Sequence, residues 1–182
     1  MNVERTEIPE VKIMTPRRLS DGRGFFSEVF SVREFSAIDS PAFVQDNHSL
    51  SSRSFTIRGL HFQINPRAQG KLVRVARGRV LDIAVDIRRS SPTFGKYVAV
   101  ELSAENWRQL WVPIGFAHGF CTLEPDTEVL YKVTDYYSAE HDRGLAFDDP
   151  DLAIPWPVSS DAAILSEKDR GHPRLASLGE FF

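Results

Sequence analysis

The sequence of 182 residues predicts an all-β fold, an antiparallel sandwich or barrel with a few short helices. Apolar and polar residues alternate through short runs, which is the pattern of strands with one face in a core. Turn residues such as Gly78 and Pro92 break these runs at regular intervals, and long helical patterns are nearly absent. Because the apolar content of 42% suffices for a core and no linker or repeat is visible, we expect one domain over residues 1–182.

The clearest strand runs from Leu81 to Ile87, where the odd-numbered aliphatic residues share one face. Asp82, Ala84 and Asp86 share the other face. The same alternation predicts further strands, in chain order, at Ile8–Met14, Phe25–Val32, Phe43–Ser51, Ile57–Gln63, Leu72–Ala76, Tyr97–Leu102, Gln109–Val112, Gly119–Leu123 and Glu128–Thr134, with short helices at Val32–Ala37 and Ala162–Asp169.

Charge and cysteine content exclude several classes of protein. A formal charge of -3 gives no field that attracts nucleic acid or an acidic membrane, so we expect neither partner. Cys121 is the single cysteine, which excludes an internal disulfide and any site built on CxxC. The first residues, MNVERTEIPEVK, carry charges where a secretory signal needs an apolar run, and no segment has the length of a membrane span. We therefore expect a cytoplasmic protein.

The strongest chemical signal is the segment IRGLHFQINPRAQGK, from Ile57 to Lys71. It places Arg58, His61 and Lys71 on and around one strand of a mildly acidic protein. A neutral imidazole can take a proton, while the two cations hold negative charge on a substrate. Since inward side chains of several strands converge in a barrel, this combination suggests proton abstraction next to a carbonyl of a phosphorylated ligand.

Each candidate for this chemistry also has a structural interpretation. His61 could be a base held by Asp169 or Asp82, or a strand histidine with a satisfied hydrogen bond. Lys71 could stabilise an enolate oxygen, or lie solvated at a strand edge. Tyr131 is expected to face inward, where its phenol could act as a general acid or simply belong to the core.

Two motifs bear on whether the protein binds a metal ion. The segment PIGFAHG resembles the second motif of metal-binding cupins, but HFQ stands where those proteins offer HxH followed by Glu. His61 and His118 alone supply too few imidazole ligands, so we expect a metal-free pocket. A metal cupin oxygenase is the alternative, and Gln63 weighs against it.

Two polar clusters, DGRGFFSEVF and VQDNHSLSS, hold donors and acceptors that a base, a ribose and phosphates require. These clusters and IRGLHFQ, QGKLVRV, DIAVDIRRSSPTFGK, QLWVPIGFAHGF, YKVTDYY, WP and LSEKD occur in the order found in the dTDP-4-dehydrorhamnose 3,5-epimerases of dTDP-L-rhamnose biosynthesis. The chain resembles that family over nearly its whole length. The resemblance implies a cupin-type jelly-roll barrel, a homodimer, a dTDP-4-keto-6-deoxyglucose-like substrate inverted at C3 and C5, and no cofactor or metal.

The resemblance also implies roles for single residues. His61 looks like the base, with Asp169 as its carboxylate partner. Tyr131 looks like the acid on the opposite face, and Lys71 like the group that stabilises the enolate at the C4 oxygen. The remaining residues implied to surround the substrate, some from the partner subunit and Tyr137 stacked on thymine, are Arg23, Phe26, Glu28, Gln45, Asn47, Arg58, His118, Tyr137 and Lys168.

Strand alternation places one condition on this site. His61 and Arg58 fall on opposite faces of a regular strand, so both can reach one pocket only if a bulge intervenes, most naturally at Gly59. Two other functions stay open: a 3-epimerase acting at one carbon, and a non-catalytic nucleotide-sugar-binding barrel. The combination of His61 with Lys71, Tyr131 and a carboxylate favours an enzyme, since a binding protein needs no base or acid.

Overall fold

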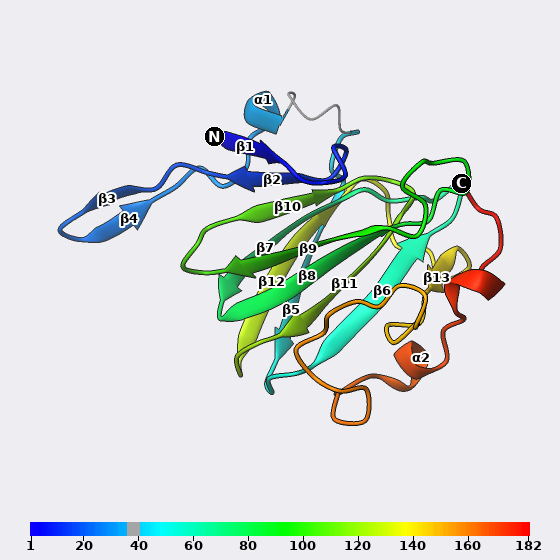
Figure 1. Cartoon of the computed structure of the whole chain (residues 1–182). Helices are drawn as coiled ribbons and strands as arrows, with labels where there is room; N and C mark the ends of the chain where they lie inside the picture. Colours follow the sequence, from blue (N-terminus) through cyan, green and yellow to red (C-terminus); the bar gives the residue numbers. More distant parts are fainter. Residues whose placement is uncertain (36–40) are drawn as a thin grey trace.

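The computed structural model describes residues 1–35 and 41–182 and confirms the all-β fold, a cupin-type jelly roll. Two antiparallel sheets face one another, and a two-stranded hairpin projects from them (Figure 1). The six-stranded sheet has the order β1 (Asn2–Arg5), β2 (Lys12–Thr15), β10 (Gln109–Val112), β7 (Lys71–Arg77), β12 (Thr127–Val133), β5 (Gln45–Ser51). The five-stranded sheet has the order β13 (Asp142–Gly144), β6 (Ile57–Gln63), β11 (Phe116–Thr122), β8 (Arg79–Asp86), β9 (Tyr97–Ser103). The remaining elements are β3 (Leu19–Asp21) and β4 (Gly24–Phe26) of the hairpin, helices α1 (Val32–Phe35) and α2 (Glu167–Arg170), and the 3₁₀ helix η2 (Leu175–Ser177).

Most predicted strands lie within a few residues of their expected ends, and β6 and β10 match residue for residue. The prediction for Ile8–Met14 is wrong in its first half, because a turn closed by a bond from Val11 N to Ile8 O precedes β2. In the predicted strand Phe25–Val32, pairing ends at Phe26. Alternation does not predict β1 and β13, since both are short and lie at sheet edges.

The helices of the described chain are short, as expected. α1 agrees with the predicted helix Val32–Ala37 as far as it can be followed, and residues 36–37 lie outside the described residues. The prediction for Ala162–Asp169 is wrong in its first part, because α2 begins only after Ser166, whose hydroxyl accepts a hydrogen bond from the backbone of Asp169. No helix in residues 1–35 and 41–182 is long and apolar enough to cross a membrane.

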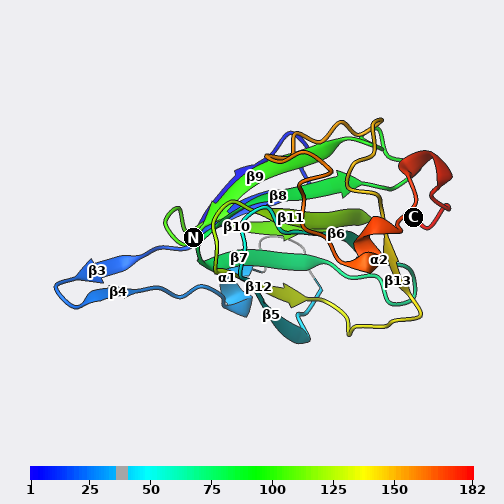
Figure 2. The same cartoon turned by 90° about the horizontal axis from the view of Figure 1, so that it is seen from below.

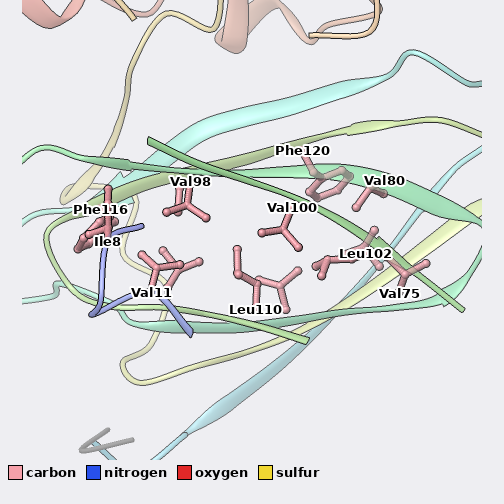
Figure 3. Packing of buried hydrophobic residues seen from close by; sticks show 14 residues of the cluster. Ile8, Val11, Val75, Val80, Val98, Val100, Leu102, Leu110, Phe116 and Phe120 are labelled. Atoms are coloured by element: carbon pink, nitrogen blue, oxygen red, sulfur yellow. The ribbon is translucent and has the colours of Figure 1, made fainter. Parts of the chain in front are cut away.

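The main core fills the space between the two sheets. Figure 3 shows this cluster of 14 buried apolar residues, contributed by strands of both sheets and by the turn before β2. Each fully buried aliphatic side chain contributes about 1.5–3 kcal/mol through removal from water. The cluster leaves the interior beside β5 and β6 to polar side chains, and that is where a site can form.

A second apolar cluster covers the outer face of the five-stranded sheet. Leu60 and Phe62 of β6 and Ile83 and Val85 of β8 pack under residues of the C-terminal segment, among them Leu145. The outer faces of β6 and β8 are therefore buried, which fixes the side chains of these strands that face inward. Figure 2 shows the C-terminal segment with α2 beside β6.

Candidate active site

A cavity of about 140 Å³ lies in the polar part of the interior. Its wall combines residues of both sheets with residues of the loops near β12 and β13. The lining residues are Gln45, Asn47, His61, Phe62, Gln63, Gln69, Lys71, Tyr131, Tyr137 and Asp142. The sequence predicts six of these for the site: Gln45, Asn47, His61, Lys71, Tyr131 and Tyr137.

A bulge in β6 turns both Arg58 and His61 toward the interior. His61 pairs with His118 of β11, and the next recorded pair is Arg58 with Phe120, so three steps along β6 match two along β11. Gly59 has a φ of 120°, and a Cβ at this position would lie 2.6 Å from the backbone of β11. Only glycine fits this conformation and this close approach. The predicted bulge is confirmed.

His61 is held by the carboxylate of Asp169. The ring Nε2 lies 2.5 Å from Asp169 Oδ1, while the other carboxylate oxygen accepts from the Ser166 hydroxyl at 2.8 Å. Burial acts to raise the pKa of Asp169, but the bonds from His61 and Ser166 outweigh it and bring the pKa below its usual value. The His61 side chain is 31% exposed. An oriented imidazole that stays accessible is suited to accept a proton.

Lys71 places a desolvated cation in the cavity wall. Its side chain is buried, and its ammonium donates to the carbonyl oxygen of His61 at 3.1 Å. Burial lowers the pKa of Lys71 to about 8, although the charges of Asp142 and Asp82 act to raise it. The group is still mostly protonated at pH 7, and because its ammonium is desolvated it can stabilise negative charge on a ligand.

Tyr131 reaches the cavity from the other sheet. It lies on β12, in the six-stranded sheet, whereas His61 lies on β6, in the five-stranded sheet. Burial raises the pKa of the Tyr131 phenol, and nearby Arg58 offsets this in part. Within residues 1–35 and 41–182 its hydroxyl has no hydrogen-bond partner, so a neutral phenol is available as a proton donor.

A second histidine–aspartate pair lies behind the cavity wall. His118 Nε2 is 2.9 Å from Asp82 Oδ1, and both side chains are buried. His118 neighbours His61 across the β6–β11 pairing but does not line the cavity. Its predicted contact with substrate stays a prediction.

Polar side chains at the mouth of the cavity are linked by hydrogen bonds. The carboxylate of Asp142 accepts from the Tyr137 hydroxyl at 3.2 Å and from the ammonium of Lys168. The backbone of Tyr137 donates to Gln45 Oε1, and the Gln45 amide in turn donates to Asn47 at 2.8 Å. Tyr137 itself is largely exposed.

Seven predicted residues do not line the cavity of the single chain: Asp169, His118 and Lys168, described above, and Arg23, Phe26, Glu28 and Arg58. Arg23 and Phe26 lie in the hairpin, which projects from the barrel at the end opposite α2 and β13 (Figures 1 and 2). Glu28 follows that hairpin, and like the other two it is exposed. Arg58 lies at the rim, where it donates to Ser51 Oγ at 3.1 Å.

Sequence reasoning misses several residues at this site, among them Gln69, Asp142 and His172. Asp142 and Gln69 line the cavity, and His172 packs edge-on against His61 with ring centroids 5.5 Å apart. Asp142 lies on β13, which has no alternation to mark it. The one available signal for His172 is its position three residues after Asp169 in the chain.

Comparisons with known proteins agree on one family. A profile for dTDP-4-dehydrorhamnose 3,5-epimerase matches residues 5–177. A protein of that name from Sinorhizobium fredii is 55% identical over 179 residues, covering 98% of this chain and 91% of the relative. The epimerase of that name from Bacillus anthracis, solved with TDP and PPi bound, is 51% identical with a TM-score of 0.91, covering 95% of this chain and 98% of that one. A dTDP-6-deoxy-D-glucose-3,5-epimerase from Legionella pneumophila, in complex with dTDP-4-keto-L-rhamnose, is 45% identical with a TM-score of 0.93, covering 98% and 94%.

Proposed function

Because the chain belongs to the dTDP-4-dehydrorhamnose 3,5-epimerase family, we propose that it inverts C3 and C5 of dTDP-4-dehydro-6-deoxy-D-glucose to give dTDP-4-dehydro-L-rhamnose. Both carbons flank the C4 ketone, which makes their protons acidic. One observation carries the mechanism: His61 and Tyr131 come from opposing sheets and line one cavity. A base and an acid on opposite faces of a planar intermediate invert a carbon centre.

The proposed steps use four side chains. His61 takes the proton from the carbon, and the electron pair moves into an enolate with its charge on the C4 oxygen. The ammonium of Lys71 stabilises that charge, and Asp169 stabilises the imidazolium that forms. Tyr131 returns a proton to the opposite face of the carbon, which completes one inversion. Before the second carbon reacts, the His61 imidazolium loses its proton to solvent and the Tyr131 phenolate regains one from solvent. The same steps at the second carbon then complete the product.

The size of the cavity sets where the parts of the substrate lie. Pockets for drug-sized ligands measure about 300–1,000 Å³, so a cavity of about 140 Å³ suits the sugar ring alone. We place the nucleotide at the mouth, near Gln45, Asn47 and the exposed ring of Tyr137, which would stack on thymine. Lys168 and Arg58 would hold the diphosphate, and His118 would support the sugar from behind the wall.

A homodimer would complete the nucleotide site. The hairpin exposes Phe25 by 49% and Phe26 by 70%, and isolated apolar arms of this kind mark interaction surfaces. We propose that the hairpin of one protomer brings Arg23, Phe26 and Glu28 to the nucleotide bound by its partner. Phe26→Glu should lower the molar mass measured by light scattering toward that of one chain. A dimer that persists unchanged would place the interface elsewhere.

The reaction as proposed needs no cofactor or metal, since the ketone supplies the acidity and side chains supply base and acid. Turnover should therefore be unaffected by exhaustive treatment with a chelator. A loss of turnover that added metal restores would contradict this. Single-domain organisation over residues 1–182 and a cytoplasmic location stay predictions.

The decisive experiment is proton NMR in deuterated water with dTDP-4-keto-6-deoxyglucose. We expect the wild type and the surface control His48→Asn to incorporate deuterium at C3 and C5, and His61→Asn to incorporate neither. Exchange at C3 alone would identify a 3-epimerase. A protein that binds the nucleotide sugar without exchange at either carbon would be a binding barrel.

A further inference from the structure

Three side chains with metal-ligating atoms converge at the edge of the cavity. They are His61 on β6, Asp169 on α2 and His172 directly after α2, and their ligand atoms lie within 4.8 Å of one another. His61 Nε2 is 2.5 Å and His172 Nε2 is 3.5 Å from the same oxygen of Asp169. The mechanism above uses the first two residues and leaves His172 without a role.

His172 is buried, and one of its ring nitrogens lacks a hydrogen-bond partner in the described parts of the chain. Its side chain is 9% exposed, and this nitrogen is Nε2. Gly144 of β13 lies directly against the ring, and a methyl group at that position would overlap it. The imidazole is thus held beside Asp169 with a nitrogen to spare.

Two imidazoles and one carboxylate form a donor set that zinc favours, with metal–ligand distances of about 2.0–2.2 Å. We propose that His61, Asp169 and His172 bind a divalent transition-metal cation, preferentially zinc, and that the bound ion inhibits the enzyme. Of the three residues His61 lines the cavity, from which the ion and a fourth ligand such as water would reach the site. A zinc-bound imidazole keeps a proton on its other ring nitrogen, so it has no lone pair left for a substrate proton.

Two features set the strength and selectivity of such a site. Lys71 and Lys168 lie nearby, and their positive charges oppose the ion, so we expect weaker binding than at a closed structural zinc site. Magnesium and calcium prefer oxygen ligands, of which this group offers one residue, so neither should compete. The inhibitory part of the proposal rests on His61 being the base, whereas the binding part does not.

Binding is tested with zinc alone, by competition with a chromophoric chelator. We expect one zinc per chain for the wild type, and at least about tenfold weaker binding for His172→Asn, as for other lost metal-site groups. Gly144→Ala, which displaces the ring without removing it, should also weaken binding. His48→Asn, which removes an exposed histidine outside the cluster, should bind as the wild type does. Equal affinity of wild type and His172→Asn, or no binding by the wild type, overturns the proposal.

Inhibition is tested with the deuterium-exchange assay. Zinc should stop exchange by the wild type, a chelator should restore it, and His172→Asn should need at least about tenfold more zinc for half-inhibition. Exchange that continues in zinc-saturated protein, or increases with zinc, overturns the inhibitory part. A protein that binds zinc through His172 but exchanges no substrate proton would refute the proposed epimerase and leave the metal site standing.

Discussion

Two histidines on the neighbouring strands β6 and β11 each contact an aspartate, and the two pairs differ in their access to water. His118 and Asp82 lie 2.9 Å apart, with side chains 6% and 0% exposed. His61 and Asp169 lie 2.5 Å apart, with side chains 31% and 5% exposed. The residue types and the contact are nearly the same in both pairs. Access to the cavity therefore separates a pair that can exchange a proton with a ligand from one that holds strands together.

A third pair extends the comparison to the surface. His48 and Glu128 lie 3.0 Å apart on β5 and β12, with side chains 57% and 30% exposed. Ion pairs in such settings contribute about 0–1 kcal/mol, because water and salt screen them. Removing one partner should then cost stability in the buried pair, activity in the half-exposed pair, and little in the exposed pair.

The largest effect is expected for the half-exposed pair. His61→Asn should lower kcat/KM by about 10²–10⁴-fold, the usual contribution of a general base. The midpoint of urea unfolding should change little, because water reaches the side chain. Initial rates of deuterium incorporation and urea titration of the same preparation check both expectations. A variant that loses stability but keeps its rate would reverse the roles assigned to the two pairs.

The buried pair should respond in stability. Asp82→Ala leaves the His118 ring buried without its partner, which should lower the free energy of unfolding by about 3–5 kcal/mol. Asp169→Asn keeps a hydrogen-bonding group beside a ring that water reaches, so its cost should be about 1–2 kcal/mol. Urea unfolding monitored by tryptophan fluorescence measures both. If both variants lost the same free energy of unfolding, solvent exposure would not explain the difference between the two pairs.

The protonation of Lys71 should make both activity and stability depend on pH, in opposite directions. With a pKa of about 8, its ammonium is lost as the pH rises, so the rate should fall above about pH 8. Because the pKa of Lys71 in the folded chain lies below the ordinary lysine value of 10.5, the unfolded chain binds the extra proton in this range. The contribution of Lys71 to the free energy of unfolding therefore rises with pH between these values while activity falls.

Comparison with Lys71→Met isolates this contribution to stability. Cys121 titrates in the opposite sense, because burial raises its thiol pKa to about 12 and its contribution falls with rising pH. Subtracting the urea-unfolding curves of Lys71→Met from those of the wild type cancels that effect. A difference that does not grow from pH 8 upward would show that the Lys71 ammonium is not destabilised by burial.

The smallest effect is expected at the surface pair. His48→Asn should change the free energy of unfolding by no more than about 0.5 kcal/mol, as for most surface substitutions. The rate of deuterium incorporation should equal that of the wild type. A larger loss in either measurement would mean that β5 is covered in solution, for example by a second protomer.

Most strands of the barrel can be predicted from sequence because they bury one or both faces. Burial leaves regularly spaced apolar residues in the sequence. The aliphatic residues of β8 recur at every second position from Leu81, and the pattern of β6 predicts its bounds residue for residue. The bulge at Gly59 follows from requiring Arg58 and His61 in one pocket. The edge strands β1 and β13 have too few buried residues to leave a pattern, and α2 starts where Ser166 caps it rather than where apolar residues begin.

The site is less predictable where it depends on contacts far apart in the chain. His61 and Asp169 are separated by 108 positions, and the residues alone do not distinguish Asp169 from Asp82 as the partner. Only the path of the C-terminal segment across β6 brings Asp169 to His61 and His172 with it. Asp142 likewise enters the cavity through a short edge strand that local sequence does not mark.

Because of the bulge at Gly59, the function of β6 depends on the number of residues between Arg58 and His61. Between Arg58 and His61 the chain contains one residue more than the opposing stretch of β11. Deleting Gly59 would remove the bulge and restore regular pairing with β11. Every residue on one side of the deletion would then point to the opposite face of the sheet. Either His61 would enter the apolar layer under Leu145, or Arg58 would. The spacing between these two positions is thus as much a requirement of the active site as the identity of the side chains.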